Sequence, residues 1–143
     1  MKKLKNAQHA EPGFHAVKMG DLLYFEGPLI SLFADKHKPD TYYLYKWADR
    51  DNRANRWLVF RLSSRELLLF FSAEVSLLEL LHNARCVWVM DMNSSLEIAG
   101  VVSSRVPDLP AEYLPSAWAY YNEAEYTMFA SVFRRTLEKA LVS

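Results

Sequence analysis

A Gly27-Pro28 pair divides the most strand-like stretch of the chain into two apolar runs, residues 21–26 and 29–34. A single strand through both runs would be much longer than the usual length of about five or six residues. Proline donates no ladder hydrogen bond, and glycine adopts the backbone angles that a sharp change of direction needs. The pair therefore predicts either a tight hairpin or a kink in one long edge strand, and we expect two pairing segments. Glu26 is then a solvent-facing residue of the bend.

Four further runs along the chain are also typical of strands. Residues 41–47 and 56–62 are rich in Tyr, Trp and Leu, and a short polar loop separates them. This spacing predicts a second hairpin. Residues 86–92 and 96–102 form another pair around an Asn-Ser-Ser turn. Because only short connections join the members of each pair, the pattern predicts an antiparallel sheet of about six strands.

Two short helices are expected between the second and third pairs of strands. Ser63 and Ser76 are each followed three residues later by a glutamate. This is the pattern of a capping box, in which the serine and the glutamate each accept a hydrogen bond from the other's backbone amide. The two boxes predict helices near residues 64–72 and 76–83.

The segment from residue 122 to residue 141 predicts a longer C-terminal helix. Asn122, with a glutamate three residues later, resembles an N-terminal cap, and the basic residues late in the segment suit the helix dipole. A second apolar row, Met128 and Val132, widens the apolar arc, and we expect it to contribute to a protein contact such as a homodimer. The main apolar stripe, which we expect to pack on the sheet, comprises Tyr126, Phe129, Ala130, Phe133, Leu137, Ala140 and Leu141.

The fold class that these elements predict is α+β, with an antiparallel sheet, two short helices and one longer C-terminal helix. We expect residues 1–20 to form a flexible N-terminal segment and residues 21–143 to form a single domain. No apolar run approaches the about 20 residues of a membrane helix, and no apolar signal-peptide region follows the N-terminal lysines. Cys86 is the single cysteine, so the chain forms no internal disulfide, and we expect a cytoplasmic protein.

The sequence contains no pattern that indicates a catalytic, cofactor-binding or metal-binding residue, and we expect no cofactor. Its four histidines include no pair at i, i+4 spacing, and its four glycines form no phosphate-binding loop. The loop that begins at Asp49 resembles an EF-hand, but it lacks the central glycine and the terminal glutamate that calcium binding requires. We expect Cys86 to be a buried strand residue and not a nucleophile. An active site assembled from distant residues stays open as an alternative.

Several arginines gather around the hairpin of residues 43–61, beside Tyr and Trp residues. Arginine and aromatic side chains together can hold phosphates or stack on bases. The alternative is a solvated hairpin whose arginines pair with Asp49 and Asp51. Basic and acidic residues number 17 each, so the chain has no global attraction to nucleic acid. The candidate phosphate-binding residues are Arg50, Arg53 and Arg56.

Some of the expected strands are apolar on both faces. Leu58 and Phe60 lie on one face of their strand, while Trp57 and Val59 lie on the other. Antiparallel sheets usually leave one face polar, so the second face here needs a cover, either from the helices or from a partner protein. Aromatic residues, which are enriched at interfaces, concentrate before the C-terminal helix. The candidate partner interface comprises Trp118, Tyr120, Tyr121, Met128 and Val132.

The order of the segments YFEGPLISLF, YYLYKW, RWLVFRLSSREL and EVSLLELL resembles a family of small bacterial domains of unknown function. The signature of that family is a strand that ends in a Tyr-(Asp/Glu)-Gly-Pro turn, and Glu26 stands here where aspartate would be expected. The resemblance covers residues 21–92, about half of the chain, and implies no activity. The positions that carry it are Tyr24, Gly27, Pro28, Trp57, Leu58, Ser63 and Leu77.

These observations predict a non-enzymatic protein-interaction or adaptor module of the bacterial cytosol, with a protein partner or a homodimer and no membrane contact. The size of the chain and the resemblance together suggest an accessory component of a defence or toxin-immunity system. The alternative is a nucleic-acid or nucleotide-binding protein that uses the hairpin of residues 43–61, which is less favoured. An enzyme with a dispersed site is a third class.

Overall fold

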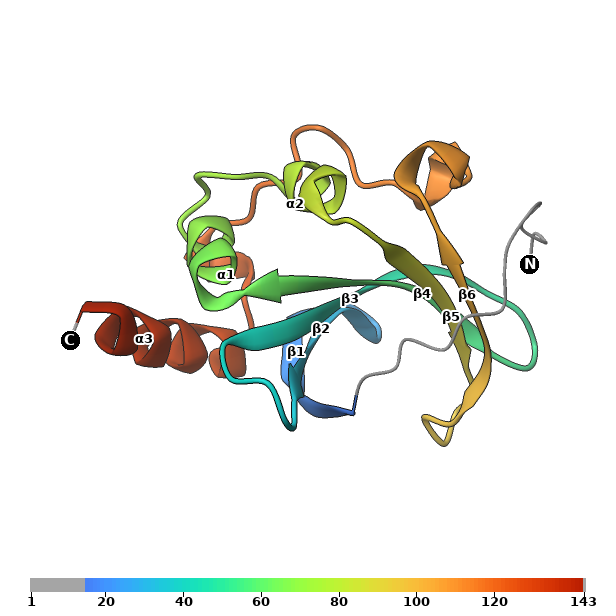
Figure 1. Cartoon of the computed structure of the whole chain (residues 1–143), viewed down its shortest axis with the longest axis horizontal. Coiled ribbons are helices and arrows are strands. Elements are labelled where there is room, and N and C mark those ends of the chain that lie inside the picture. Colours follow the sequence, from blue (N-terminus) through green and yellow to red (C-terminus); the bar gives the residue numbers. More distant parts are fainter. Residues whose placement is uncertain (1–14, 143) are drawn as a thin grey trace.

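The structure is a computed structural model that describes residues 15–142, and its centre is a six-stranded antiparallel sheet (Figure 1). Each strand pairs with the next one along the chain, so the sheet is a simple meander and the predicted α+β class is confirmed. The connection between the fourth and fifth strands carries two helices, and a third follows the sheet. The strands are β1 (Ala16–Tyr24), β2 (Pro28–Asp35), β3 (Thr41–Arg50), β4 (Asn55–Ser63), β5 (Val87–Met92) and β6 (Ile98–Ser104).

The Gly27-Pro28 pair closes a tight turn between β1 and β2, as the hairpin alternative predicts. The Phe25 amide donates to the Gly27 carbonyl at 2.9 Å across the turn. Glu26 and Gly27 both take positive φ values, 55° and 140°, in the region that favours glycine. Glu26 is exposed. The Gly27-Pro28 pair therefore turns the chain sharply, and the hydrogen bond across the turn constrains its backbone.

The first strand begins earlier than the sequence indicates. β1 starts at Ala16, so residues 16–20 belong to the sheet and not to a flexible N-terminal segment. Three register shifts interrupt the pairing of β1 with β2 and conceal the alternation of side chains that would mark a strand. The remaining part of the expected flexible segment, residues 1–14, lies outside the described residues.

Both predicted capping boxes are present. α1 (Ser64–Phe71) begins after Ser63, whose hydroxyl accepts from the Glu66 amide at 3.2 Å, while Glu66 accepts from the Ser63 amide at 3.0 Å. Ser76 forms the same reciprocal pair with its glutamate at the start of α2 (Leu77–Asn83). These two short helices lie where the sequence places them because their start signals are local.

The C-terminal helix begins later than expected. α3 spans Met128–Val142, whereas the cap at Asn122 starts only a single 3-10 turn, Glu123–Glu125. The chain then becomes extended, and the Thr127 amide donates to the Leu22 carbonyl of β1 at 3.0 Å. The Thr127 hydroxyl accepts from the Ala130 amide at 3.1 Å and caps the helix. The hydrogen bond to β1 therefore delays the helix, and sequence spacing alone does not reveal it.

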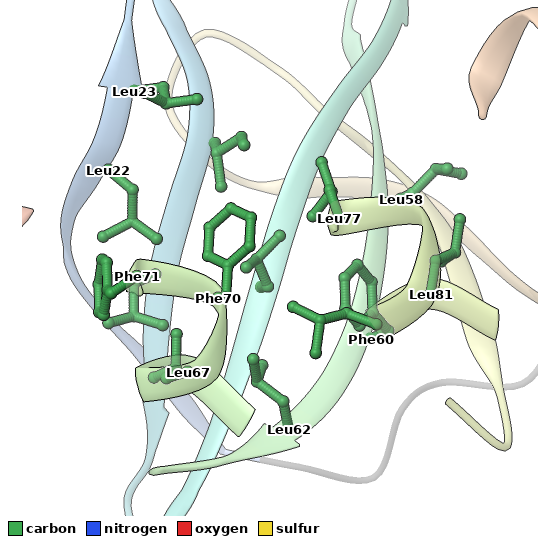
Figure 2. Packing of buried hydrophobic residues seen from close by; sticks show 14 of the residues in the cluster. Leu22, Leu23, Leu58, Phe60, Leu62, Leu67, Phe70, Phe71, Leu77 and Leu81 are labelled. Carbon is green, nitrogen blue, oxygen red and sulfur yellow. The ribbon is translucent and has the colours of Figure 1, made fainter. Parts of the chain in front are cut away.

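The main core lies between the sheet and its helices, and we call it the helix-side cluster. Figure 2 shows the side chains of α1 and α2 pointing toward those of the strands beneath them. On α3 the apolar stripe is buried as far as Leu137, but Ala140 and Leu141 are exposed, which corrects the end of the predicted stripe. Members of the helix-side cluster are Leu22, Leu23, Leu58, Phe60, Leu62, Leu67, Phe70, Phe71, Leu77 and Leu81, with Ala130, Phe133 and Leu137 from α3.

The opposite face of the sheet carries a second buried cluster, whose members among residues 15–142 are all strand residues and which we call the strand-only cluster. Of the two covers that the sequence leaves open for this face, the helices contribute no residue to this cluster among residues 15–142. Aromatic rings of neighbouring strands pack against one another instead, with Phe33 stacked on Tyr45 at 3.9 Å between ring centres. The strand-only cluster comprises Tyr43, Tyr45, Trp57, Val59, Met90, Met92 and Val101, with Phe33, Trp47 and Trp88 packed against it.

Candidate functional site

Arg56 is held in a cross-strand ion pair. Its Nε donates to Oδ1 of Asp91 at 2.8 Å and its Nη2 to Oδ2 at 3.0 Å, while Nη1 donates to the Tyr113 hydroxyl at 3.1 Å. Only 11% of the Arg56 side chain is exposed. The hydrogen bonds to Asp91 raise the pKa of the guanidinium. Arg56 is therefore committed to the fold, and the predicted group of three phosphate-binding arginines is reduced to two.

Of the other two arginines, Arg50 ends β3 and Arg53 lies in the loop between β3 and β4. Both are exposed, and neither is paired with its acidic neighbours. Asp49 accepts from the Arg50 amide at 2.8 Å, and Asp51 accepts from the Arg53 amide at 2.8 Å. Hydrogen bonds from the loop amides, that of Arg53 first, lower the pKa of Asp51. The aspartates thus shape the loop backbone, and within residues 15–142 neither the Arg50 nor the Arg53 guanidinium makes an ion pair.

A pocket of about 400 Å³ opens between the β1–β2 turn and the end of the β3–β4 hairpin, and we call it the turn pocket. Trp47 and Trp57 are direct cross-strand partners at this end of the sheet. The indole Nε1 of Trp47 donates to the Asn55 side-chain oxygen at 3.1 Å. The lining residues are Phe25, Glu26, Gly27, Pro28, Leu29, Trp47, Arg50, Asn55 and Trp57.

A second pocket, of about 310 Å³, lies where the start of α1 meets the end of α2. Its carboxylates already serve the helix start, because Asp40 accepts from the Ser64 amide at 3.2 Å and Glu66 completes the capping box. Arg61 lies over the Tyr43 ring, 5.6 Å from its centre. Burial raises the pKa of the Cys86 thiol, which disfavours the thiolate that a nucleophile would need. Cys86 is half-buried and lies just before β5, so the prediction of a buried strand residue is wrong on both points.

The five predicted interface residues do not form one group. Tyr121 packs against Phe70 and Tyr126 in the helix-side cluster, so it contributes to the core. Trp118 is 83% exposed and lies in the segment after β6 that bonds to the start of α2. Tyr120 belongs to the same segment, and its hydroxyl donates to Glu79 of α2 at 3.1 Å.

The two remaining interface residues lie on α3. Met128 is 84% exposed and Val132 is 53% exposed, and they are one helical turn apart. Their helix is anchored on β1, because the Phe129 ring lies so close to Gly20 that an added Cβ would come within 2.6 Å of it. The predicted second apolar row of the helix is therefore exposed to solvent, while the first row is buried or half-buried as far as Leu137.

Among residues 15–142 no group of three or more His, Cys, Asp and Glu side chains is placed to hold a metal ion. In the same range no helix combines the length and the apolar character needed to cross a membrane. No known family model matches the chain, and neither a curated protein nor a solved structure is significantly similar to it. The resemblance to small bacterial domains consequently stays a prediction.

Sequence reasoning missed the turn pocket. It considered Glu26 as an isolated residue of a bend, and it considered Trp47 and Trp57 as aromatic neighbours of the arginines in a candidate phosphate-binding hairpin. The available signal is the pair Tyr24-Phe25 one residue before the Gly-Pro turn, since adjacent residues of a strand point to opposite faces of the sheet. Both are strongly exposed in the structure, at 61% and 71%. That Trp47 and Trp57 lie in the same pocket as Phe25 follows only from the pairing of β2 with β3.

Proposed function

We propose that this chain is a non-enzymatic protein-interaction module and that it associates with a second copy of itself through α3. The observation that carries the proposal is the exposure of Met128 and Val132 on a helix whose opposite side is buried. Exposed methionine is characteristic of adaptable binding surfaces. We call these two residues, with the charged residues on either side of them in sequence, the α3 surface.

The charges along the α3 surface support pairing with an identical copy. Exposed Glu123 and Glu125 precede the apolar pair, and exposed Arg135 and Lys139 follow it. In an interface with two-fold symmetry the same surface of both copies meets in antiparallel orientation, so the acidic end of one copy would face the basic end of the other. The apolar residues would then lie near the symmetry axis.

The neighbouring edge of the sheet adds apolar area beside the helix. α3 packs on β1 through Phe129 and Gly20, and Met19, next to that glycine, is 38% exposed. Val17 on the same strand is 44% exposed. Register shifts and Lys18 on β1 are typical of edge strands that are protected against direct strand addition. The proposed contact therefore uses side chains and does not extend the sheet.

Sedimentation equilibrium of wild type and variants tests this proposal. We expect a concentration-dependent dimer that Met128→Glu and Val132→Glu each weaken by about tenfold or more, because a charge would be buried at the centre of the contact. Leu141→Glu is the matched control, since it places the same charge at an exposed apolar position near the end of the same helix. A monomeric wild type, or a dimer that tolerates both central substitutions, would contradict the proposal.

The alternative function, nucleic-acid or nucleotide binding at the hairpin, has weaker support because Arg56 is engaged with Asp91. Arg50 and Arg53 alone would have to supply the phosphate contacts. A salt-dependent complex with RNA or DNA that Arg50→Ala with Arg53→Ala abolishes would favour this alternative. A place in a bacterial defence or toxin-immunity system, and in the cytoplasm, remains part of the proposal.

A further inference from the structure

We propose that the turn pocket binds an extended peptide segment of a partner protein in which a proline or aromatic residue neighbours an acidic residue. This pocket is built by the β1–β2 turn and the β3–β4 hairpin, and none of its lining residues belongs to α3. The inference therefore concerns a different surface and partner from those of the proposed dimer, and each can fail without the other.

The indole rings of the pocket are held in place before any ligand arrives. Trp57 is only 8% exposed and packs edge-on against Tyr45 of the strand-only cluster, with 6.4 Å between ring centres. Trp47 is paired with it across the strands and is oriented by its hydrogen bond to Asn55. Fixed aromatic rings provide the flat apolar surfaces on which proline and aromatic side chains of peptides dock.

Phe25 supplies an exposed aromatic wall on a tight turn. Its side chain is 71% exposed, yet its backbone amide is bonded to Gly27 and the next residue is held at positive φ. An aromatic side chain in solvent makes few contacts within its own chain, and a backbone constrained in this way loses little conformational entropy on binding. Phe25 can therefore close against a ligand side chain that has entered the pocket.

The charges at the mouth of the pocket determine which ligand residue is favoured next to the side chain that enters the pocket. Arg50 lines the pocket, and its guanidinium makes no ion pair with the described residues, since Asp49 accepts instead from the Arg50 amide and the Tyr113 hydroxyl. A guanidinium in this state is a ready partner for a carboxylate. Glu26 lines the pocket from the other turn and repels a carboxylate there, so an acidic residue is accepted on the Arg50 side alone.

The size and exposure of the pocket favour a peptide. A volume of about 400 Å³ is near the lower end of the range for small-molecule sites, and it suits one or two side chains. Phe25, Glu26 and Arg50 at its mouth are all exposed, so a chain that inserts a side chain can continue past the rim in both directions. Tyr24, 61% exposed beside the turn, extends the aromatic surface outside the pocket.

A selection from a phage-displayed library of random decapeptides on the immobilised protein tests the inference. We expect the enriched sequences to contain proline or an aromatic residue next to Asp or Glu. Synthetic peptides of the enriched sequence, labelled with a fluorophore, then give affinities by anisotropy. An absence of enrichment, or enrichment of peptides that lack an acidic residue, would overturn the proposal.

Pocket variants locate the binding. Phe25→Ala and Arg50→Glu are each expected to weaken the selected peptide by about tenfold or more, without change in the melting temperature, since both side chains are exposed. Arg53→Glu is the matched control, because it reverses an exposed charge in the adjoining β3–β4 loop, outside the pocket lining, and we expect a much smaller effect. Binding that survives Arg50→Glu, or that Arg53→Glu weakens equally, would place the peptide elsewhere and refute the assignment.

Discussion

The two faces of the sheet are both buried, but they are built differently. The helix-side cluster is largely aliphatic and is closed by α1, α2 and α3, as Figure 2 shows for its first two helices. The strand-only cluster is rich in aromatic residues and receives no helix residue. Both described pockets open beside it, one at Trp47 and Trp57 and the other at Trp88. The helix-side face thus carries the larger cluster of the core, and the aromatic face, which carries the strand-only cluster, borders the turn pocket for which we propose a ligand.

Polar atoms on the side chains of the aromatic face allow this face to border a pocket that is open to solvent. The Tyr43 hydroxyl donates to Asp35 at 2.9 Å, and the Trp47 indole donates to Asn55. Tyr and Trp combine an apolar ring with a polar group, so they can be buried along the ring while the polar end reaches the edge of the sheet. A cluster of such side chains can border solvent through its polar ends. A cluster of leucines at the same place would expose apolar area.

The largest expected effect tests whether the two faces differ in this way. Phe60 is 1% exposed in the helix-side cluster, and Phe60→Ala should lower the free energy of unfolding by about 3–5 kcal/mol, since it leaves a cavity that the helices cannot fill. Phe25→Ala, the same substitution at the turn pocket, should change it by less than about 0.5 kcal/mol. Urea denaturation of both variants measures this. Equal losses would show that the turn pocket is as structural as the core.

A smaller effect concerns the polar boundary of the helix-side cluster. Asp91→Asn removes the carboxylate that holds the Arg56 guanidinium and leaves that charge largely buried beside Tyr113. We expect a loss of about 1.5–3 kcal/mol, the usual range for hydrogen bonds to charged groups. Asp108→Asn, at an exposed position, is the control. If the two substitutions cost the same in urea denaturation, the ion pair contributes nothing to stability and Arg56 would again be a candidate for ligand binding.

The sequence predicts the helix-side face better than the aromatic face, for physical reasons. Capping boxes at Ser63 and Ser76 are local signals, and the apolar residues on both faces of β4 report its burial directly, so both features were predicted correctly. The start of α3 depends on a hydrogen bond between Thr127 and Leu22, residues far apart in the chain. The turn pocket likewise forms only when the sheet brings together the β1–β2 turn and the end of the β3–β4 hairpin, which are distant in sequence. The partner of Arg56 lies on another strand, and no spacing rule connects it with Asp91.

The smallest expected effect is a pH dependence on the aromatic face. Hydrogen bonds from the His37 and Lys38 amides, with a further one from the Tyr43 hydroxyl, lower the pKa of Asp35 from 3.8 to about 2. Because the folded-state pKa is depressed, this carboxylate stabilises the fold at neutral pH, and its contribution is lost as the pH falls from about 4 to about 2. Asp35→Asn should therefore lower the urea midpoint slightly at neutral pH and flatten its decline across that acid range.

Tyr43→Phe removes only the weaker hydroxyl contribution, so it should leave most of the decline in place. If wild type and Asp35→Asn lose stability in parallel between those pH values, Asp35 does not couple the aromatic face to pH. The network of Asp35 and Tyr43 would then only orient the ring, and the polar edge of this face would add nothing to folding beyond the packing of its aromatic rings.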